Sequence, residues 1–166
     1  SGSVSVDDRP AAELPGWEPS APLLYERRVS LSLSGWQPFF SPMLPLLFPR
    51  EREFLQEHIS ADSRRSGGGD AKSTLAGRLV FYDLETTGLS HGAGTVAFMA
   101  ALGRIEQPSD GGPARLAVHQ LLLADYPGET AFLERFAALA GDDPVFVSFN
   151  GKCFDSQILA NRFLMN

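Results

Sequence analysis

Residues 79–85, LVFYDLE, place the carboxylates of Asp83 and Glu85 inside an otherwise apolar run. The apolar residues occupy both alternating sets of positions, which is typical of a central β-strand covered on both faces. Side chains alternate along a strand, so Asp83 and Glu85 project from one face, about 6–7 Å apart, while Leu84 points the other way. Two carboxylates this close are costly to bury unless something positive lies between them. The run therefore predicts a strand that carries a cation-dependent site.

Further strands and helices are predicted on the C-terminal side of this run. Residues 95–105 (TVAFMAALGRI) and 115–124 (RLAVHQLLLA) are apolar strands joined by a turn-rich link, which favours an antiparallel pair. Residues 126–141 (YPGETAFLERFAALAG) have helical spacing, with Gly141 placed to cap the helix. Residues 144–150 (PVFVSFN) predict a short strand and residues 154–166 (FDSQILANRFLMN) a last helix. The predicted order is β-β-β-α-β-α, an α/β fold. The apolar residues expected to face inward from the two helices are Phe132, Leu133, Phe136, Leu139, Ile158, Leu159, Phe163 and Met165.

Asp155 is expected to join Asp83 and Glu85. A right-handed crossover through the helix after residue 128 lays residues 144–150 parallel to residues 79–85, which then lie between that strand and residues 95–105. Asp155 follows the carboxyl end of this neighbouring strand, where open α/β sheets bind their ligands. Three converging carboxylates are oxygen ligands suited to Mg²⁺ or Mn²⁺. Two plainer interpretations stay open, in which Asp155 caps the last helix and the other two carboxylates lie on a solvated strand end.

The N-terminal part of the chain differs in composition from the rest. Eight of the twelve prolines precede residue 75, which disfavours long helices and central strands over residues 1–50. Residues 25–35 predict a short strand, residues 49–60 a short helix that begins near Pro49, and residues 63–73 a glycine-rich link. We therefore divide the chain into a proline-rich segment, residues 1–75, and an α/β domain, residues 76–166.

The overall composition excludes several classes of protein. The 166-residue chain has 14 basic and 20 acidic residues, a formal net charge of −6, so a nucleic-acid partner would need a local basic patch or bound cations. Cys153 is the only cysteine, which excludes an internal disulfide and a cysteine-cluster zinc site. The first residues, SGSVSVDD, lack the apolar core of a signal peptide, and the most apolar early stretch is broken by prolines. We expect a cytoplasmic protein that does not contact a membrane.

Three stretches of the sequence resemble one known family. FYDLETTGL (81–89), GAGT (92–95) and VFVSFNGKCFDSQIL (145–159) look like the YprB-type RNase H-like domain, a branch of the DnaQ-like, or DEDD, 3′–5′ exonucleases. The resemblance covers residues 78–166 and implies an RNase H-like mixed sheet. It places Asp83 and Glu85 in the first exonuclease motif and Asp155 in the second. The three would be catalytic as ligands of two divalent metals, Mg²⁺ or Mn²⁺, in the hydrolysis of nucleic-acid phosphodiester bonds.

The resemblance also implies a third motif, with a fourth acidic ligand and a His or Tyr that activates water. The sequence ends before this motif, so we expect the chain as given to be catalytically inactive or nearly so. The alternative is a catalytically silent RNase H-like module that binds nucleic acid or protein. A weaker possibility is a divalent-cation site with a structural role.

The partner implied by the resemblance is a single-stranded end of DNA or RNA. Thr86, Thr87 and Leu89 directly follow the first motif and would contact the terminal nucleotide, although turn chemistry explains the threonines nearly as well. Asn150 would shape the turn before the last helix. Lys152 would reach a phosphate, although an isolated lysine is usually solvated surface.

Overall fold

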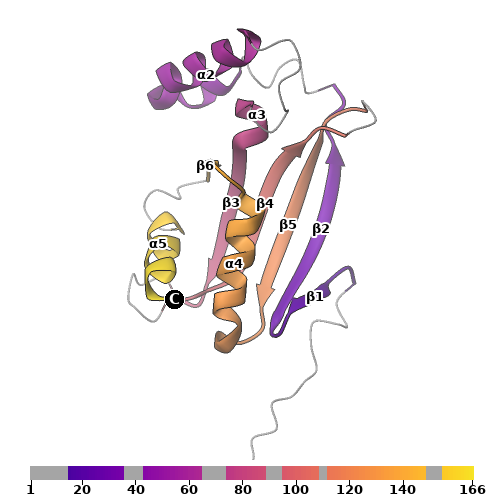
Figure 1. The fold of residues 1–166 in the computed structure, drawn as a ribbon, viewed down its shortest axis with the longest axis vertical. Helices are drawn as coiled ribbons and strands as arrows, with labels where there is room; N and C mark the ends of the chain where they lie inside the picture. The colour runs from indigo at the N-terminus through magenta and orange to yellow at the C-terminus, as the bar shows by residue number, and fades with distance from the viewer. Residues whose placement is uncertain (1–14, 36–42, 65–73, 89–94, 109–111, 149–154) are drawn as a thin grey trace, which may run out of the picture.

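The centre of the molecule is one six-stranded mixed sheet (Figure 1). The computed structural model describes residues 15–35, 43–64, 74–88, 95–108, 112–148 and 155–166. The strand order is β1-β2-β5-β4-β3-β6, and β3–β6 is the parallel pair. The strands are β1 (Glu18–Ala21), β2 (Leu24–Ser32), β3 (Leu79–Thr86), β4 (Ala97–Glu106), β5 (Arg115–Leu123) and β6 (Val145–Val147). The helical elements include η2 (Pro49–Glu51), α2 (Arg52–Arg64), α3 (Leu75–Arg78), η4 (Tyr126–Gly128), α4 (Glu129–Ala140) and α5 (Asp155–Met165), and residues 43–47 are helical as well.

The predicted surroundings of β3 are confirmed. β3 pairs with β4 in antiparallel register, from Val80 opposite Arg104 to Thr86 opposite Ala97. On its other side it pairs with β6 in parallel, with Leu79 opposite Val145. The parallel pairing requires a crossover, and α4 provides it. β4 and β5 also form the predicted antiparallel pair.

The sheet extends into the proline-rich segment. All nine residues of β2 pair with β5, from Leu24 opposite Leu123 to Ser32 opposite Arg115, and β1 adds the outermost strand. The predicted short strand therefore exists, but it belongs to the same sheet as the C-terminal strands. The division of the chain near residue 75 stays a prediction, and the sheet itself crosses that boundary.

α4 covers one face of the sheet and supplies much of the main core (Figure 1). Phe132, Leu133 and Phe136 are buried as predicted, whereas Leu139 is only partly buried and Ala140 is the fourth apolar residue that is fully covered. The ring of Phe136 meets the ring of Tyr82 on β3 edge to face, with their centroids 6.2 Å apart. The helix ends at Gly141, whose φ of 74° and N–H donated to the Ala137 carbonyl form the predicted cap.

A second, smaller core lies at the end of the sheet near α2 and α3. Leu44, Leu55, Leu75 and Leu79 are buried together there, which joins residues 43–64 to the start of β3. The side chain of Arg104 on β4 reaches the same region and donates hydrogen bonds to the carbonyls of Leu139 (3.0 Å), Ala140 (2.9 Å) and Gly77 (2.9 Å). One guanidinium group thus satisfies carbonyls at the C-terminal ends of both α3 and α4.

α5 differs from its predicted packing. Ile158 and Leu159 are buried as expected, but Phe163 is 44% exposed and Met165 61% exposed, so the expectation that both face inward is wrong. An ion pair instead of apolar packing fixes the C-terminal part of α5, because Arg162 binds both carboxylate oxygens of Glu129 at the start of α4. Among the described residues, no helix is long and apolar enough to cross a membrane.

Candidate metal centre beside β3

Asp83 and Glu85 lie on the face of β3 that points away from α4. They alternate with Tyr82 and Leu84, which are buried in the core beneath α4. Both carboxylates are exposed, so the burial that their apolar neighbours suggested is wrong. The strand nevertheless lies inside the sheet, with β4 and β6 on its two sides. Two like charges are tolerable in this arrangement because water solvates them.

Asp155 is the buried member of the three carboxylates. It is the first residue of α5 and is 7% exposed. Burial raises the pKa of its carboxyl group above the ordinary value, and the negative charges of Asp83 and Glu85 raise it further. The residue after Asp155, Ser156, links the start of α5 to β3 through a hydrogen bond between its hydroxyl group and that of Tyr82, with the two oxygens 2.7 Å apart. The structure therefore brings Asp155 within electrostatic reach of both residues predicted to act with it.

The donor chemistry of this site fits a hard divalent cation. Mg²⁺ and Mn²⁺ prefer carboxylate oxygens, and a cation would offset the charge repulsion that raises the pKa of Asp155. Within the parts of the chain that the structure describes, no group of three or more His, Cys, Asp or Glu side chains is placed closely enough to hold a metal ion. Asp83, Glu85 and Asp155 are thus suitable ligands that lie near one another without forming a closed cage.

Thr86 and Thr87 organise the turn that follows the first two carboxylates. Thr86 Oγ1 donates to the carbonyl of Gly88 at 3.0 Å. Thr87 Oγ1 accepts from the N–H of Val96 at 3.2 Å, and the Thr87 N–H donates back to the Val96 carbonyl at 3.0 Å. These contacts are the turn chemistry expected of threonine, and the predicted contacts with a nucleotide stay untested. Leu89, Asn150 and Lys152 lie outside the described residues.

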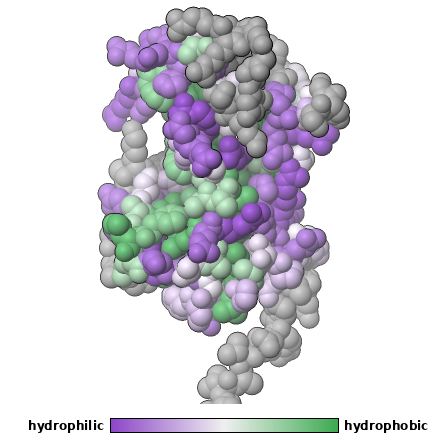
Figure 2. All heavy atoms as spheres, in the orientation of Figure 1, coloured by the Kyte–Doolittle hydropathy of each residue, from purple (hydrophilic) through white to green (hydrophobic). Residues whose placement is uncertain are grey.

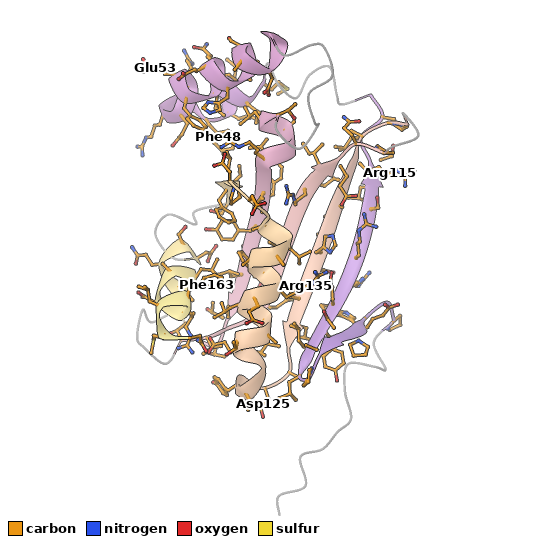
Figure 3. All side chains as sticks on the ribbon, in the orientation of Figure 1. Phe48, Glu53, Arg115, Asp125, Arg135 and Phe163 are labelled. Carbon is orange, nitrogen blue, oxygen red and sulfur yellow. The ribbon has the colours of Figure 1, made fainter. Side chains whose placement is uncertain are left out.

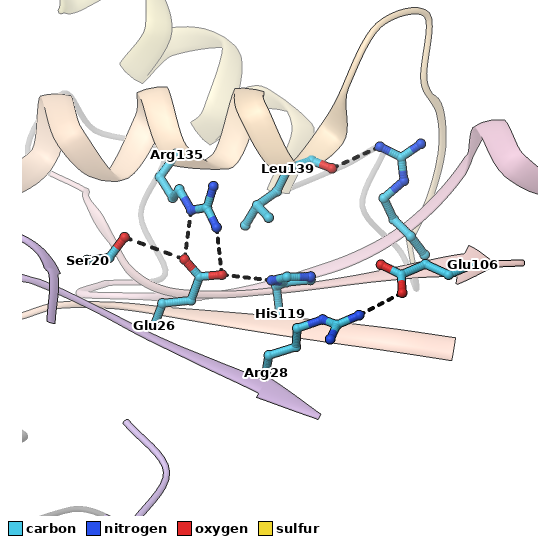
Figure 4. Close-up of polar contacts among 8 residues, drawn as sticks. Ser20, Glu26, Arg28, Glu106, His119, Arg135 and Leu139 are labelled. Carbon is cyan, nitrogen blue, oxygen red and sulfur yellow. Dashed lines mark hydrogen bonds and ion pairs between the residues drawn. The ribbon is translucent and has the colours of Figure 1, made fainter. Parts of the chain in front are cut away.

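A second cluster of charged residues, which the sequence analysis missed, lies between α4 and the sheet (Figure 4). Glu26 on β2 accepts hydrogen bonds from Arg135 Nε (2.7 Å) and Nη2 (2.8 Å) on α4 and from His119 Nδ1 (2.7 Å) on β5. The hydrogen bonds from Arg135 are the main cause that lowers the pKa of Glu26 below its ordinary value, and His119 adds to the effect. We call Glu26, Arg135 and His119 the Glu26 network. Because the charged groups of these residues bond to one another within the fold, we assign the network a structural rather than a catalytic role.

Comparison with known proteins agrees with the fold and with the motifs. The profile of the RNase_H superfamily matches residues 80–166, which is 87 of the 166 residues and more than half of the chain. The "Uncharacterized protein YprB" of Bacillus subtilis (strain 168) is 35% identical over 85 residues, 51% of this chain. The matched region spans only 19% of that relative's length, and no solved structure matches. The resemblance to the YprB type is thereby confirmed, and the chain belongs to the RNase H superfamily.

Proposed function

We propose that this protein hydrolyses phosphodiester bonds of nucleic acid with the help of divalent metal ions, as a 3′–5′ exonuclease-like domain. The observation that carries the proposal is the position of Asp155, a buried carboxylate at the start of α5, which the hydrogen bond between Ser156 and Tyr82 holds against β3 close to Asp83 and Glu85. Carboxylates gathered beside a central strand are the ligand type that phosphoryl-transfer sites need. Membership of the RNase H superfamily supports the same class of reaction.

Each residue of the site has a distinct role in this proposal. Asp83 and Glu85 would bind the cation from the exposed side of β3, and Asp155 from the start of α5. Bound Mg²⁺ or Mn²⁺ would lower the pKa of the attacking water and stabilise the charge on the leaving 3′ oxygen. Because the chain carries a formal net charge of −6, the cations would also let a phosphate approach the carboxylates. The turn held by Thr86 and Thr87 would position the end of a single strand beside them.

A catalytically silent module is the second candidate function. It is favoured by the absence, among the described residues, of three ligands close enough to hold a metal ion. In this case the fold would bind nucleic acid or protein without cleaving it, and the exposed carboxylates would be ordinary solvated surface.

The test is a cleavage assay on single-stranded DNA and RNA that carry a label at the 5′ end. The protein is incubated with Mn²⁺, Mg²⁺ or EDTA, and the products are resolved at single-nucleotide resolution. From a longer protein that includes the third motif implied by the resemblance, we expect a ladder that shortens from the 3′ end with metal, and background rates for its Asp83→Asn and Asp155→Asn variants. For residues 1–166 alone we expect cleavage at or near background. Glu134→Gln, which removes an exposed carboxylate from α4, is the matched control and should leave the rate unchanged. Equal cleavage by the longer protein and its Asp83→Asn variant would refute the assignment, and binding without cleavage would favour the silent module.

A further inference from the structure

A groove of about 650 Å³ lies between the N-terminal helical segment and the start of α5. Its walls come from η2 and α2 on one side and from β3, β6 and α5 on the other. Figure 2 shows the molecule hollowed on this side, between the helices at the top and the apolar surface below them, and Phe48 lies at its upper border in Figure 3. The volume is within the range of small-molecule sites, roughly 300–1,000 Å³. It is therefore large enough to admit one planar ring system.

The groove is lined mainly by aromatic and aliphatic side chains, and several rings remain open to solvent. Phe54 on α2 is 42% exposed and Phe146 on β6 is 47% exposed. Both rings are held by neighbours, since Phe146 meets Tyr82 with centroids 5.3 Å apart and Phe54 meets His58 with centroids 4.1 Å apart. Fixed, exposed rings in a concave site are suited to stack on a flat ligand rather than to bind a flexible chain.

Five polar or charged side chains line the groove: Arg50, Glu51, Tyr82, Ser148 and Ser156. The hydroxyl groups of Tyr82 and Ser156 are paired at 2.7 Å where β3 meets α5, and the exposed side chain of Arg50 lies on the side formed by the N-terminal segment. A hydroxyl pair can donate to or accept from the edge of a base. A guanidinium group can bind the phosphate next to that base.

The groove also touches the candidate metal centre. Ser156, which lines the groove, directly follows Asp155 at the start of α5, so the hydroxyl pair of the groove lies near Asp155, the carboxylate that is within electrostatic reach of Asp83 and Glu85. A nucleotide whose base lay in the groove would therefore carry its phosphate close to the cation that these carboxylates would hold. This continuity favours a nucleotide over an apolar peptide as the occupant.

We propose that this groove binds one unstacked base of the single-stranded substrate, with the base between Phe54 and Phe146 and its phosphate toward Arg50 or the carboxylates. The inference rests on the proposed function and extends it, because it gives residues 44–55 a role in holding substrate. It also explains why a helical segment outside the family match packs beside the site. Stacking is tolerant of base identity, so the groove would add affinity without sequence specificity.

The first test measures affinity without cleavage. The probe is fluorescein-labelled oligothymidylate of eight nucleotides, titrated by fluorescence anisotropy in Ca²⁺ with Mg²⁺ and Mn²⁺ omitted. Phe54→Ala should weaken binding between about fivefold and a hundredfold, the loss typical of one base–aromatic stack. Phe54→Tyr keeps the ring and should bind as the unmodified protein does. Phe163→Ala is the matched control, because Phe163 is 44% exposed on α5 and does not line the groove. Circular dichroism and thermal unfolding verify that each variant is folded.

The second test locates the base. The same oligonucleotide with one 5-iodouracil is irradiated on the protein, and cross-linked peptides are identified by mass spectrometry. Cross-links to the peptide that contains Phe54 or to the one that contains Phe146 support the groove. The inference is overturned if cross-links form only elsewhere, if Phe54→Ala binds no more weakly than Phe163→Ala, or if the unmodified protein does not bind the probe. If the groove tests fail but cleavage still depends on Asp83, the groove proposal is wrong and the proposed function stands. If the oligonucleotide binds in a way that depends on Phe54 but is not cleaved by the longer protein, the groove proposal is supported and the nuclease assignment is wrong.

Discussion

Replacing Glu26 by Gln removes the negative charge at the centre of the Glu26 network while keeping the size of the side chain. In the folded protein this carboxylate accepts four hydrogen bonds: two from Arg135 and one from His119 at 2.7 or 2.8 Å, and a longer one from Ser20 Oγ at 3.5 Å. The network ties β2 and β5 to α4 (Figure 4). Its loss should therefore lower the stability of the whole sheet rather than of one strand.

The size of the effect follows from the burial of the two partners. The side chain of Glu26 is 15% exposed and that of Arg135 is 37% exposed. A hydrogen bond to a charged group contributes about 1.5–3 kcal/mol, but solvent screens the half-exposed guanidinium group, so we expect a total loss near 2 kcal/mol. For a chain of this length the loss corresponds to a decrease of about 4–8 °C in the melting temperature. Glu106→Gln is the control, because the Glu106–Arg28 ion pair has side chains 44% and 51% exposed and should contribute less than about 1 kcal/mol.

The effect should also depend on pH in a defined direction. The fold lowers the pKa of Glu26 below its ordinary value of 4.5, mainly through the hydrogen bonds from Arg135. A carboxylate with a lowered pKa stabilises the folded state fully above its unfolded pKa, and the stabilisation is lost as the pH falls through the folded pKa. The difference in unfolding free energy between the unmodified protein and Glu26→Gln should thus be present at pH 5.5 and above and shrink below about pH 4.5. Urea unfolding at pH 7, 5.5, 4 and 3 measures it.

Two results would refute this reasoning. The first is a destabilisation by Glu26→Gln that is no larger than that of Glu106→Gln. The second is a difference between Glu26→Gln and the unmodified protein that stays the same at pH 3 and pH 7, since the loss would then come from packing and not from charge.

Three further predictions concern the cap of α4, the attachment of α5 and the carboxylate site. Gly141→Ala should destabilise the protein by about 1–3 kcal/mol in thermal unfolding, because φ is 74° with ψ −170° and an added Cβ would lie 2.6 Å from Arg104 Nη1; unchanged stability would contradict the cap geometry. Glu129→Gln removes an ion pair whose two side chains are 14% and 8% exposed, so hydrogen exchange should accelerate in α5 and stay unchanged in β4; equal acceleration in both would contradict this. Asp83→Asn should raise the melting temperature of the metal-free protein, because it removes one of the negative charges that repel Asp155. Mn²⁺ should raise the melting temperature of this variant by less than it raises that of the unmodified protein. An equal rise for the two proteins would count against the metal site.

Local sequence patterns predict the elements whose spacing is regular. The apolar run around Asp83 predicts a central strand, and the helical spacing of Phe132 and Phe136 with Gly141 at the end predicts α4 and its cap. The order of β4, β3 and β6 follows from loop length and from the handedness of the crossover, so it too was predictable. The proximity of Asp155 to the β3 carboxylates follows from the same topology.

Features set by contacts between distant residues could not be predicted. Residues 25–35 read as a strand, but nothing local says that β2 pairs with β5. Glu26 reads as a solvated surface residue beside two arginines, and its main partner, Arg135, is 109 residues away. The pattern of α5 suggests that Phe163 faces inward, yet the helix packs beside β3 only through its first turns and leaves Phe163 exposed. The exposure of Asp83 and Glu85 also depends on what packs against β3, which an alternating pattern does not specify.

The pairing of β2 with β5 bears on where this protein can be cut. A fragment that began at residue 76, the predicted domain boundary, or at residue 80, where the family match begins, would keep Asp83, Glu85 and Asp155 but lose all nine residues that cover the outer side of β5. β5 would become an edge strand with a row of unpaired backbone N–H and carbonyl groups, which is a template for self-association. Arg135 would also lose the carboxylate that its guanidinium group binds. The smallest unit that folds cooperatively without exposing the edge of β5 should therefore include residues 18–32, more than 40 positions before the family match begins.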